Sequence, residues 1–397
     1  MSERLQGTIV MDVPDEPAWP AVVSLALGVF SLVTAEFLPA SLLTPMAAAL
    51  HVSQGVAGQA VTATATVALV AGLLAAVITR GLDRRLVLMG FSVMLIASDL
   101  LVATARDLPA LLMARVLLGI ALGGFWSMAT AVAMRLVPET LVPRALSLVF
   151  SGVSAATIVA VPMGSYLGSQ IGWRSVFLLG ACIGLVTLLV QVVTLPRLPA
   201  TGAARLSTLV EVLLRPRIGI GMVCTVLVFT GHFGLFTYIR PFLQGASGIS
   251  TDGLSLLLLG FGLANFFGTF LAGFLLQRNL RATLALMPLI IGLAGLLLAS
   301  GVGGLGAEAL LVALWGMAFG GVPVAWSTWL SRAVPDEPES GGGLIVAAVQ
   351  LAIATGAASG GAIFDLSGAR GVFLGGGALL ALTAGIVVLG VANPKHA

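Results

Sequence analysis

The chain has 397 residues, of which 58% are apolar and only 9% are charged, and its mean hydropathy is +1.10. Soluble globular domains carry about 25% charged residues, so this composition excludes them and indicates an all-α protein that crosses a lipid bilayer many times. The net charge of +3 arises from loop arginines and predicts no nucleic-acid partner. Cys182 and Cys224 fall in separate apolar stretches, so we expect small core residues there, with no disulfide and no metal.

At about 20 residues per crossing, the sequence predicts twelve transmembrane helices. In chain order they cover 19–43, 58–79, 86–104, 108–134, 145–168, 173–195, 218–243, 254–276, 282–301, 306–330, 342–363 and 371–392. Of the 19 Lys and Arg residues, four lie in the loops opposite the termini and one lies within a span. This bias predicts that both termini are cytoplasmic.

The longest hydrophilic break divides six spans from six. The predicted organisation is a cytoplasmic tail, a six-helix bundle, a cytoplasmic linker, a second six-helix bundle and a second tail, over 1–18, 19–195, 196–217, 218–392 and 393–397. The halves also repeat at one fixed offset of 197 positions. The matched pairs are Arg84 with Arg281, Gly123-Gly124 with Gly320-Gly321, Arg135 with Arg332, Pro138 with Pro335, and Gly164 with Gly361. Two pseudo-symmetric six-helix halves in the same orientation are the architecture of a major facilitator transporter, with a central substrate cavity.

Five segments resemble the proton-coupled purine ribonucleoside efflux transporters of the drug:proton antiporter family. They are Ala35-Glu36-Phe37-Leu38-Pro39, Gly55-Val56-Ala57-Gly58-Gln59, Leu122-Gly123-Gly124-Phe125-Trp126, Phe236-Thr237-Tyr238-Ile239-Arg240-Pro241 and Trp326-Ser327-Thr328-Trp329. The resemblance covers nearly the whole chain. It implies export of purine nucleosides such as inosine and guanosine across the bacterial inner membrane, driven by protons, by a monomer without cofactors.

Glu36 stands in an uncharged stretch, where a carboxylate costs roughly 3 kcal/mol unless the protein uses it. Glu36 and Arg115 each lie seven residues from the predicted outer end of their span, about 10 Å deep, so we expect them to meet. Asp99 lies at about 8 Å. These three residues are the candidate proton-coupling group. Alternatively, Glu36 and Arg115 form a permanent ion pair that joins spans 1 and 4, and Asp99 extends to the outer interface.

Candidate substrate-binding residues combine planar rings with amide, imidazole and hydroxyl groups. Aromatic rings stack on a base, and the polar groups offer both donors and acceptors to its edge or to a ribose hydroxyl. The alternatives are packing for the rings and interhelical hydrogen bonds for the polar groups. The candidates are Trp126, His232, Phe233, Phe236, Tyr238, Asn265 and Gln350.

Candidate gating residues lie in two places. Asp83, Arg84 and Arg85 occupy the loop between spans 2 and 3, which in this fold packs on neighbouring helix ends, although the arginines also fit a simple positive-inside role. Pro162 and Gly164 are expected to bend or thin span 5 at the interface between the halves.

Other function classes fit the sequence less well. The three histidines form no metal-binding spacing, and no phosphate-binding loop or nucleophile elbow is present, so we expect no enzyme. Duplicated, glycine-rich halves favour alternating access over a static channel, and no sizeable soluble domain supports a receptor. Among transporters, proton-driven efflux of sugars or of diverse hydrophobic drugs is the alternative to nucleoside export.

Overall fold

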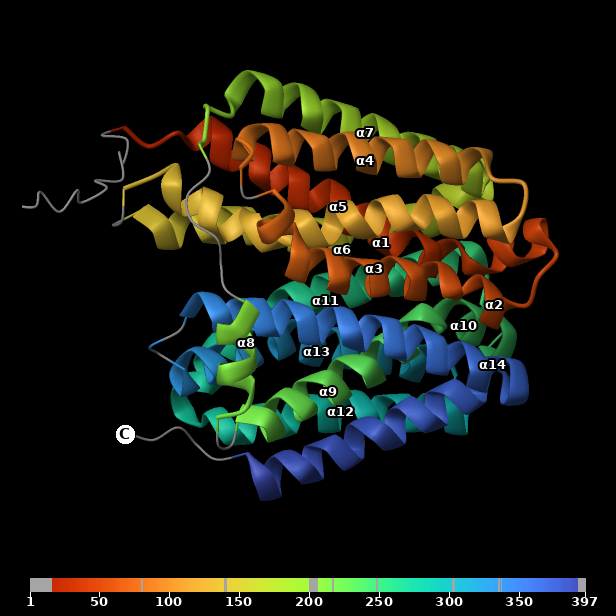
Figure 1. The fold of residues 1–397 in the computed structure, drawn as a ribbon. Coiled ribbons are helices and arrows are strands. Elements are labelled where there is room, and N and C mark those ends of the chain that lie inside the picture. The colour runs from red at the N-terminus through yellow and green to blue at the C-terminus, as the bar shows by residue number, and fades with distance from the viewer. Residues whose placement is uncertain are drawn as a thin grey trace, which may run out of the picture.

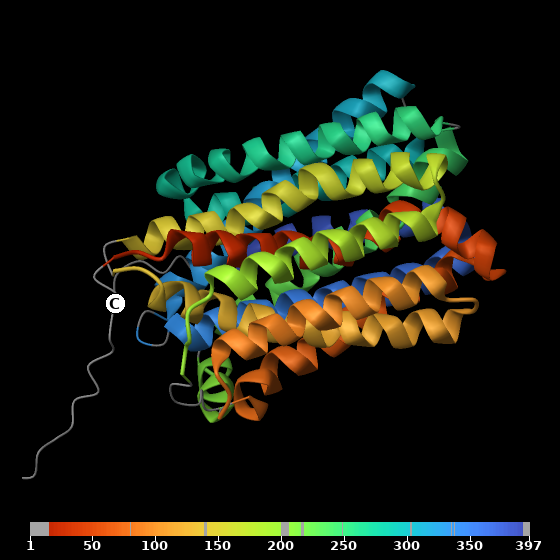
Figure 2. The same ribbon diagram turned by 90° about the horizontal axis from the view of Figure 1, so that it is seen from above.

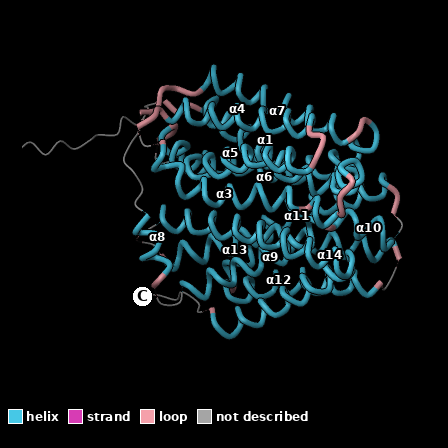
Figure 3. Tube along the Cα trace, turned by 45° about the vertical axis from the view of Figure 1, so that its right-hand side comes forward, coloured by secondary structure: helices cyan, strands magenta, loops and turns pink. Residues whose placement is uncertain are grey.

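The computed structural model describes residues 16–79, 81–138, 141–199, 206–215, 218–247, 249–301, 304–334, 336 and 338–391. Within these ranges every regular element is a helix (Figure 3). Helices satisfy all of their interior backbone groups locally, which a bilayer requires. Side chains cap several helix starts, among them Asp83, whose carboxylate accepts from the Arg85 N–H, and Asp107, which accepts from Ala110.

The first half contains α1 (Trp19–Leu50), α2 (Gln54–Ala57), α3 (Gln59–Ile78), α4 (Arg84–Thr104), α5 (Leu108–Arg135), α6 (Val142–Gln170) and α7 (Trp173–Thr194). The segment between the halves contains α8 (Leu206–Leu213). The second half contains α9 (Ile218–Thr237), α10 (Ile239–Ser247), α11 (Thr251–Arg278), α12 (Leu280–Ser300), α13 (Leu305–Ala333) and α14 (Pro338–Gly390). The predicted residues 1–15 and 393–397 of the tails lie outside the described residues.

Eleven helices among the described residues are long and apolar enough to cross a membrane, and the last of them accounts for two crossings. Helix α14 has 53 residues, or about 80 Å of helix, against a hydrocarbon core of about 30 Å. Gly368 breaks it with a positive φ of 69°, and the chain then runs back across the bundle (Figure 1). The predicted twelve-span major facilitator fold is therefore confirmed, with spans 11 and 12 joined through this glycine.

Three predicted boundaries need correction. Helix α1 continues seven residues past the predicted end at 43, because Pro39 and Pro45 are accommodated within it. The predicted seventh span, 218–243, is divided at Tyr238 into α9 and α10. The predicted linker holds a helix, α8, which has contacts with α9 and α14.

The two halves pack against each other and appear one above the other in Figure 1. The axes of their helices are roughly aligned (Figure 2). Each half has its own large apolar core. The principal contacts between the halves are those of α3 with α14 and of α6 with α11. We call the face where α1 begins and α14 ends the terminal face, and the opposite face the distal face.

The repeat seen in the sequence has a matching role in packing. A methyl group on Gly123 would overlap the carbonyl oxygen of Ala68 on α3, and one on Gly320 would overlap that of Asn265 on α11. Gly123 and Gly320 are repeat partners, and they allow α5 to pack against α3 and α13 against α11. The same close glycine contact therefore packs the corresponding helix pair in each half.

The distal face is closed by contacts between the halves. The Tyr238 hydroxyl donates to the carbonyls of Ala357 (3.0 Å) and Gly55 (3.4 Å), which belong to different halves. On α10, the Arg240 guanidinium donates to the Ser41 carbonyl on α1 and to the Ser165 hydroxyl on α6 (3.2 Å). We call these contacts of Tyr238 and Arg240 the distal closure.

Candidate functional site

Glu36 lies near the middle of α1, with only 7% of its side-chain surface exposed. Because α1 ends at Leu50, Glu36 is fourteen residues from that end, or about 21 Å along the helix axis. The helix thus extends about 10 Å farther beyond Glu36 than the predicted span end at 43 implied. A buried carboxylate in an apolar span is costly, which strengthens the case that the protein uses it.

Arg115 on α5 is completely buried and binds α1 and α3 instead of a carboxylate. Its Nη1 donates to the Ala35 carbonyl (2.9 Å) and its Nε to the Thr64 hydroxyl (2.8 Å), while Nη2 lies 3.5 Å from the Glu36 carbonyl oxygen. The only ion pair within 4.0 Å among the described residues is Arg215 with Asp336. The expected direct pair of Glu36 and Arg115 side chains is thus absent here, because Arg115 hydrogen-bonds to the main chain beside Glu36.

Asp99 on α4 is also completely buried, so the expectation that it extends to the outer interface is wrong. Its Oδ2 lies where α7 passes with Gly180, and a methyl group there would come within 2.7 Å of that oxygen. Neither Asp99 oxygen has a hydrogen-bond partner among the described residues. Asp99 therefore belongs to the interior of the first half, where α4 packs on α7.

The carboxylate of Glu36 reaches the other half of the molecule. Its side chain lies close to Gln350 on α14, which is 4% exposed. Gln350 was expected among the substrate-binding amides, and Glu36 among the proton-coupling groups. The fold brings the two together, because the first crossing of α14 passes beside the interface that α1 faces.

A small cavity of about 10 Å³ adjoins Glu36 between the halves. A space of this size holds roughly one water molecule. Its lining comes from α1, α3, α9 and α14: Glu36, Phe37, Ala40, Val61, Phe233, Phe236, Thr237 and Ile353. Phe37 packs against Phe236 with ring centroids 5.6 Å apart, so aromatic rings from both halves form one wall.

His232 is enclosed by the core of the second half. The Trp315 indole N–H donates to His232 Nδ1 (3.0 Å), and the ring of Phe319 stacks on the imidazole. His232 is 1% exposed and is absent from the cavity lining. In this conformation it positions the aromatic wall from behind, whereas Phe233 and Phe236 lie at the cavity.

Three other candidate substrate-binding residues lie apart from this cavity. Trp126 stacks on Phe150 of α6, with ring centroids 5.7 Å apart. Tyr238 uses its hydroxyl in the distal closure and is completely buried, so it presents no group to a ribose here. Asn265 is 9% exposed on α11, at the seam with α13, where Gly320 meets its carbonyl.

The loop before α4 packs on the neighbouring helix ends, as expected. The Asp83 carboxylate accepts from the Leu198 N–H (3.0 Å), Arg84 donates to the Thr79 carbonyl (3.0 Å), and Arg85 donates to the Val192 carbonyl (2.6 Å). These bonds join the loop to the end of α7 and to the segment that follows it. A gating role for this loop stays a prediction.

On α6, the glycine expected at the interface lies close to α1. A methyl group on Gly164 would come within 2.5 Å of the Ser41 hydroxyl. Pro162 lies within the same helix, and α6 also packs against α11 of the second half. Gly164 therefore lies where α6 packs on α1, and a gating role for Pro162 and Gly164 stays a prediction.

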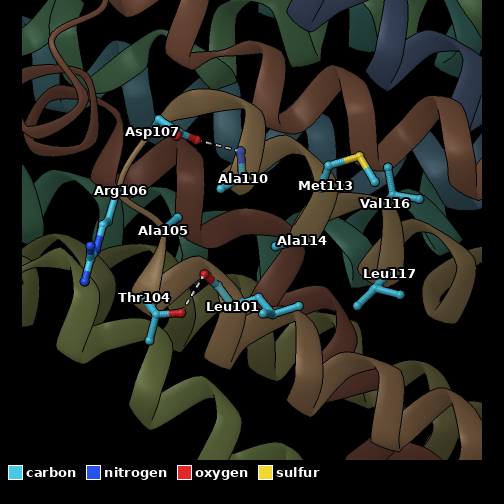
Figure 4. Close-up of a pocket in the computed structure, with 10 residues that line it drawn as sticks. All are labelled: Leu101, Thr104, Ala105, Arg106, Asp107, Ala110, Met113, Ala114, Val116 and Leu117. Carbon is cyan, nitrogen blue, oxygen red and sulfur yellow. Dashed lines mark hydrogen bonds between the residues drawn. The ribbon is translucent and has the colours of Figure 1, made fainter.

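A larger pocket of about 580 Å³ lies away from this centre, at the distal ends of α4 and α5 (Figure 4). Its walls are mostly apolar, with Arg106 and Asp107 at one edge. Asp107 is engaged in capping α5 through the Ala110 N–H (2.9 Å). Because the pocket contacts neither the second half nor Glu36, it is separate from the candidate transport site.

Several contributors were not singled out from the sequence. Phe37 could have been found from the sequence, because it directly follows Glu36. The sequence does not single out Thr64, Trp315 or Phe319, because a threonine or an aromatic residue in an apolar span usually has a packing role.

Two repeated helical halves around a buried polar centre define a secondary transporter. The chain belongs to the Major Facilitator Superfamily, whose family model matches residues 25–357 and 223–397. It is 42% identical over 387 residues to the purine ribonucleoside efflux pump NepI of Salmonella paratyphi B and to that of Salmonella enteritidis PT4. In both comparisons 98% of each chain is covered.

Solved structures agree on the fold. A mutant of the nucleoside transporter NupG matches with a TM-score of 0.77 at 14% identity, over 92% of this chain and 99% of the other. A D-xylose–proton symporter matches with a TM-score of 0.73 at 19% identity, over 95% and 98%. At these identities the likeness establishes the fold of a major facilitator transporter and nothing about the substrate.

Proposed function

We propose that this protein exports purine ribonucleosides across the bacterial inner membrane in exchange for protons. The observation that carries the substrate class is the 42% identity to the NepI pumps along 98% of both chains. The terminal face is then cytoplasmic, as the distribution of Lys and Arg favours. A single chain contains both halves and is the transporting unit.

Glu36 is the proposed proton-binding group. It is the acid that lies at the cavity between the halves, close to Gln350 of the second half. Asp99 is sealed within the first half, and Arg115 holds the main chain of α1 beside Glu36. Because this carboxyl group lies between the halves, its surroundings change when they separate. Its proton affinity therefore changes as the site opens to one side or the other.

Transport assays in proteoliposomes test both parts of the proposal. Export of inosine and guanosine is measured with and without an imposed pH gradient, alongside a sugar and a hydrophobic cationic drug. Exchange of a neutral nucleoside for one proton moves charge, so a membrane potential, worth about 2.3 kcal/mol per charge per 100 mV, should also drive it. Nucleoside export that ignores both gradients would refute proton coupling, and transport of the sugar or drug alone would refute the substrate class.

The Glu36→Gln variant locates the coupling group. We expect it to retain nucleoside counterflow and to lose proton-driven accumulation. The matched control is Glu211→Gln on α8, which is exposed and distant from the cavity. Normal accumulation by Glu36→Gln would show that Glu36 is structural.

A further inference from the structure

Glu36 and Gln350, which lie close together across the two halves, each have an oxygen without a hydrogen-bond partner. Glu36 Oε1 and Gln350 Oε1 are both buried and have no hydrogen-bond partner among the described residues. Orphaned buried acceptors are uncommon because each carries an unrecovered desolvation cost. Two of them, on neighbouring residues contributed by different halves, indicate a place for a ligand.

The two acceptors lie beside the central cavity. Glu36 lines it directly, and Ile353, which follows Gln350 by three residues on the same face of α14, lines it as well. The cavity is closed down to about 10 Å³ in this conformation, so a substrate requires the halves to separate there. Separation opens space for a ligand between the Glu36 and Gln350 side chains.

The surroundings supply acceptors but few donors. The Thr237 hydroxyl at the cavity already donates to the Phe233 carbonyl (2.7 Å), and the Arg115 guanidinium is directed to Ala35 and Thr64. A ligand that satisfies Glu36 and Gln350 must therefore bring two neighbouring donors of its own. The vicinal 2′ and 3′ hydroxyls of a ribose provide them, and every ribonucleoside has this pair, whatever its base.

The aromatic wall of the cavity fits the base of such a ligand. Phe37, Phe233 and Phe236 line the same cavity, and their faces suit a flat base better than a sugar edge. With the base against these rings, the ribose lies toward the polar pair. The arrangement separates sugar recognition from base recognition.

We propose that Glu36 and Gln350 together bind the 2′,3′-diol of the substrate's ribose, which thereby connects the two halves. This inference rests on the proposed function. A protonated Glu36 keeps one acceptor oxygen for the diol but loses its charge, so proton binding weakens the hold on the nucleoside without abolishing it, and the same holds for the neutral side chain of Glu36→Gln. Gln350 is then a specificity-determining residue that acts on the sugar.

The test compares inosine, 2′-deoxyinosine, 3′-deoxyinosine and 2′,3′-dideoxyinosine as competitors of inosine counterflow in proteoliposomes. Hydrogen bonds to a charged group are strong, so loss of either hydroxyl should weaken competition about tenfold or more. Equal competition by inosine and its dideoxy analogue would overturn the inference while leaving nucleoside transport intact. Absence of any inosine transport would instead refute the proposed function.

The Gln350→Met variant assigns the effect to this residue. It removes the amide at similar volume, and we expect the preference for inosine over the deoxy analogues to fall severalfold. The matched control is Leu351→Met, which alters the next residue of α14, with 41% of its side chain exposed, and should keep the preference. An unchanged preference in Gln350→Met would overturn the assignment.

Discussion

Arg115 shows how a single buried charge can organise one half of the molecule. Its guanidinium reaches α1 through the Ala35 carbonyl and α3 through the Thr64 hydroxyl, while its backbone belongs to α5. Arginine suits this position because its planar fork has five donors in fixed directions. By holding the main chain next to Glu36, it leaves the carboxylate available to face the other half.

We expect Arg115→Lys to destabilise the protein although the charge is kept. One ammonium group cannot reach both helices, and each lost hydrogen bond to a charged group costs about 1.5–3 kcal/mol. Thermal unfolding in detergent measures the effect. The control is Arg106→Lys in the exposed loop that precedes α5, which should change stability by less than about 0.5 kcal/mol. Equal unfolding temperatures for the two variants would contradict this role of Arg115.

Asp99 and His232 illustrate the limit of sequence reasoning at this scale. Both are polar residues in apolar spans, and that alone marked them as candidates. Their surroundings come from other helices: Asp99 meets Gly180 of α7, and His232 accepts from Trp315 of α13. A linear sequence does not show which of two buried polar residues faces the interface.

Among the elements, two helix pairs carry the pseudo-symmetry of the fold. The pairs α3–α5 and α11–α13 are each packed at a glycine of the repeat, Gly123 or Gly320, against a neighbouring carbonyl. Membrane helices gain little from hydrophobic association, so close van der Waals contact through small residues has a large share in their packing. A repeated glycine can therefore preserve a helix pair even where the rest of the sequence diverges.

We expect Gly123→Ala and Gly320→Ala to separate these helices and to lower stability and transport. A methyl group at either position overlaps backbone, which cannot rotate away. The matched controls are Gly260→Ala and Gly273→Ala on α11, where a methyl group meets nothing within 4 Å. Alanine is favoured over glycine in a helix by roughly 0.5–1 kcal/mol, so the controls should be neutral or stabilising. Thermal unfolding of the four variants decides the point.

At the scale of the whole molecule, the structure has its distal face closed and its halves joined there by Tyr238 and Arg240. The Tyr238 hydroxyl bonds to carbonyls of both halves, and Arg240 binds α1 and α6 from α10. Alternating access requires these bonds to break when the site opens to that face. The distal closure therefore sets part of the free-energy difference between the two orientations.

We expect Tyr238→Phe to shift the population toward a distally open state, since it removes only the hydroxyl. A cysteine introduced at Ala47, which is 3% exposed in the same apolar cluster, reports opening by its rate of maleimide labelling in a background without native cysteines. Loss of one to two neutral hydrogen bonds, about 0.5–1.5 kcal/mol each, predicts labelling at least about twofold faster. The control is Tyr166→Phe, at the chain's only other tyrosine, which is 43% exposed. The same labelling rate in both variants would contradict this role of Tyr238.

By itself, the sequence determined the membrane class, the number of crossings, the duplication into halves and the choice of Glu36 as a candidate functional residue. These properties depend on local composition, on segment length and on the cost of a charge in hydrocarbon, all of which can be evaluated along the chain. Only the tertiary structure decided that Arg115 binds the main chain beside Glu36, that Asp99 is sealed inside one half, and that Gln350 reaches Glu36 from the other half. The physical reason is that the partner of a buried polar group is chosen by helix packing across the bundle, between residues up to hundreds of positions apart.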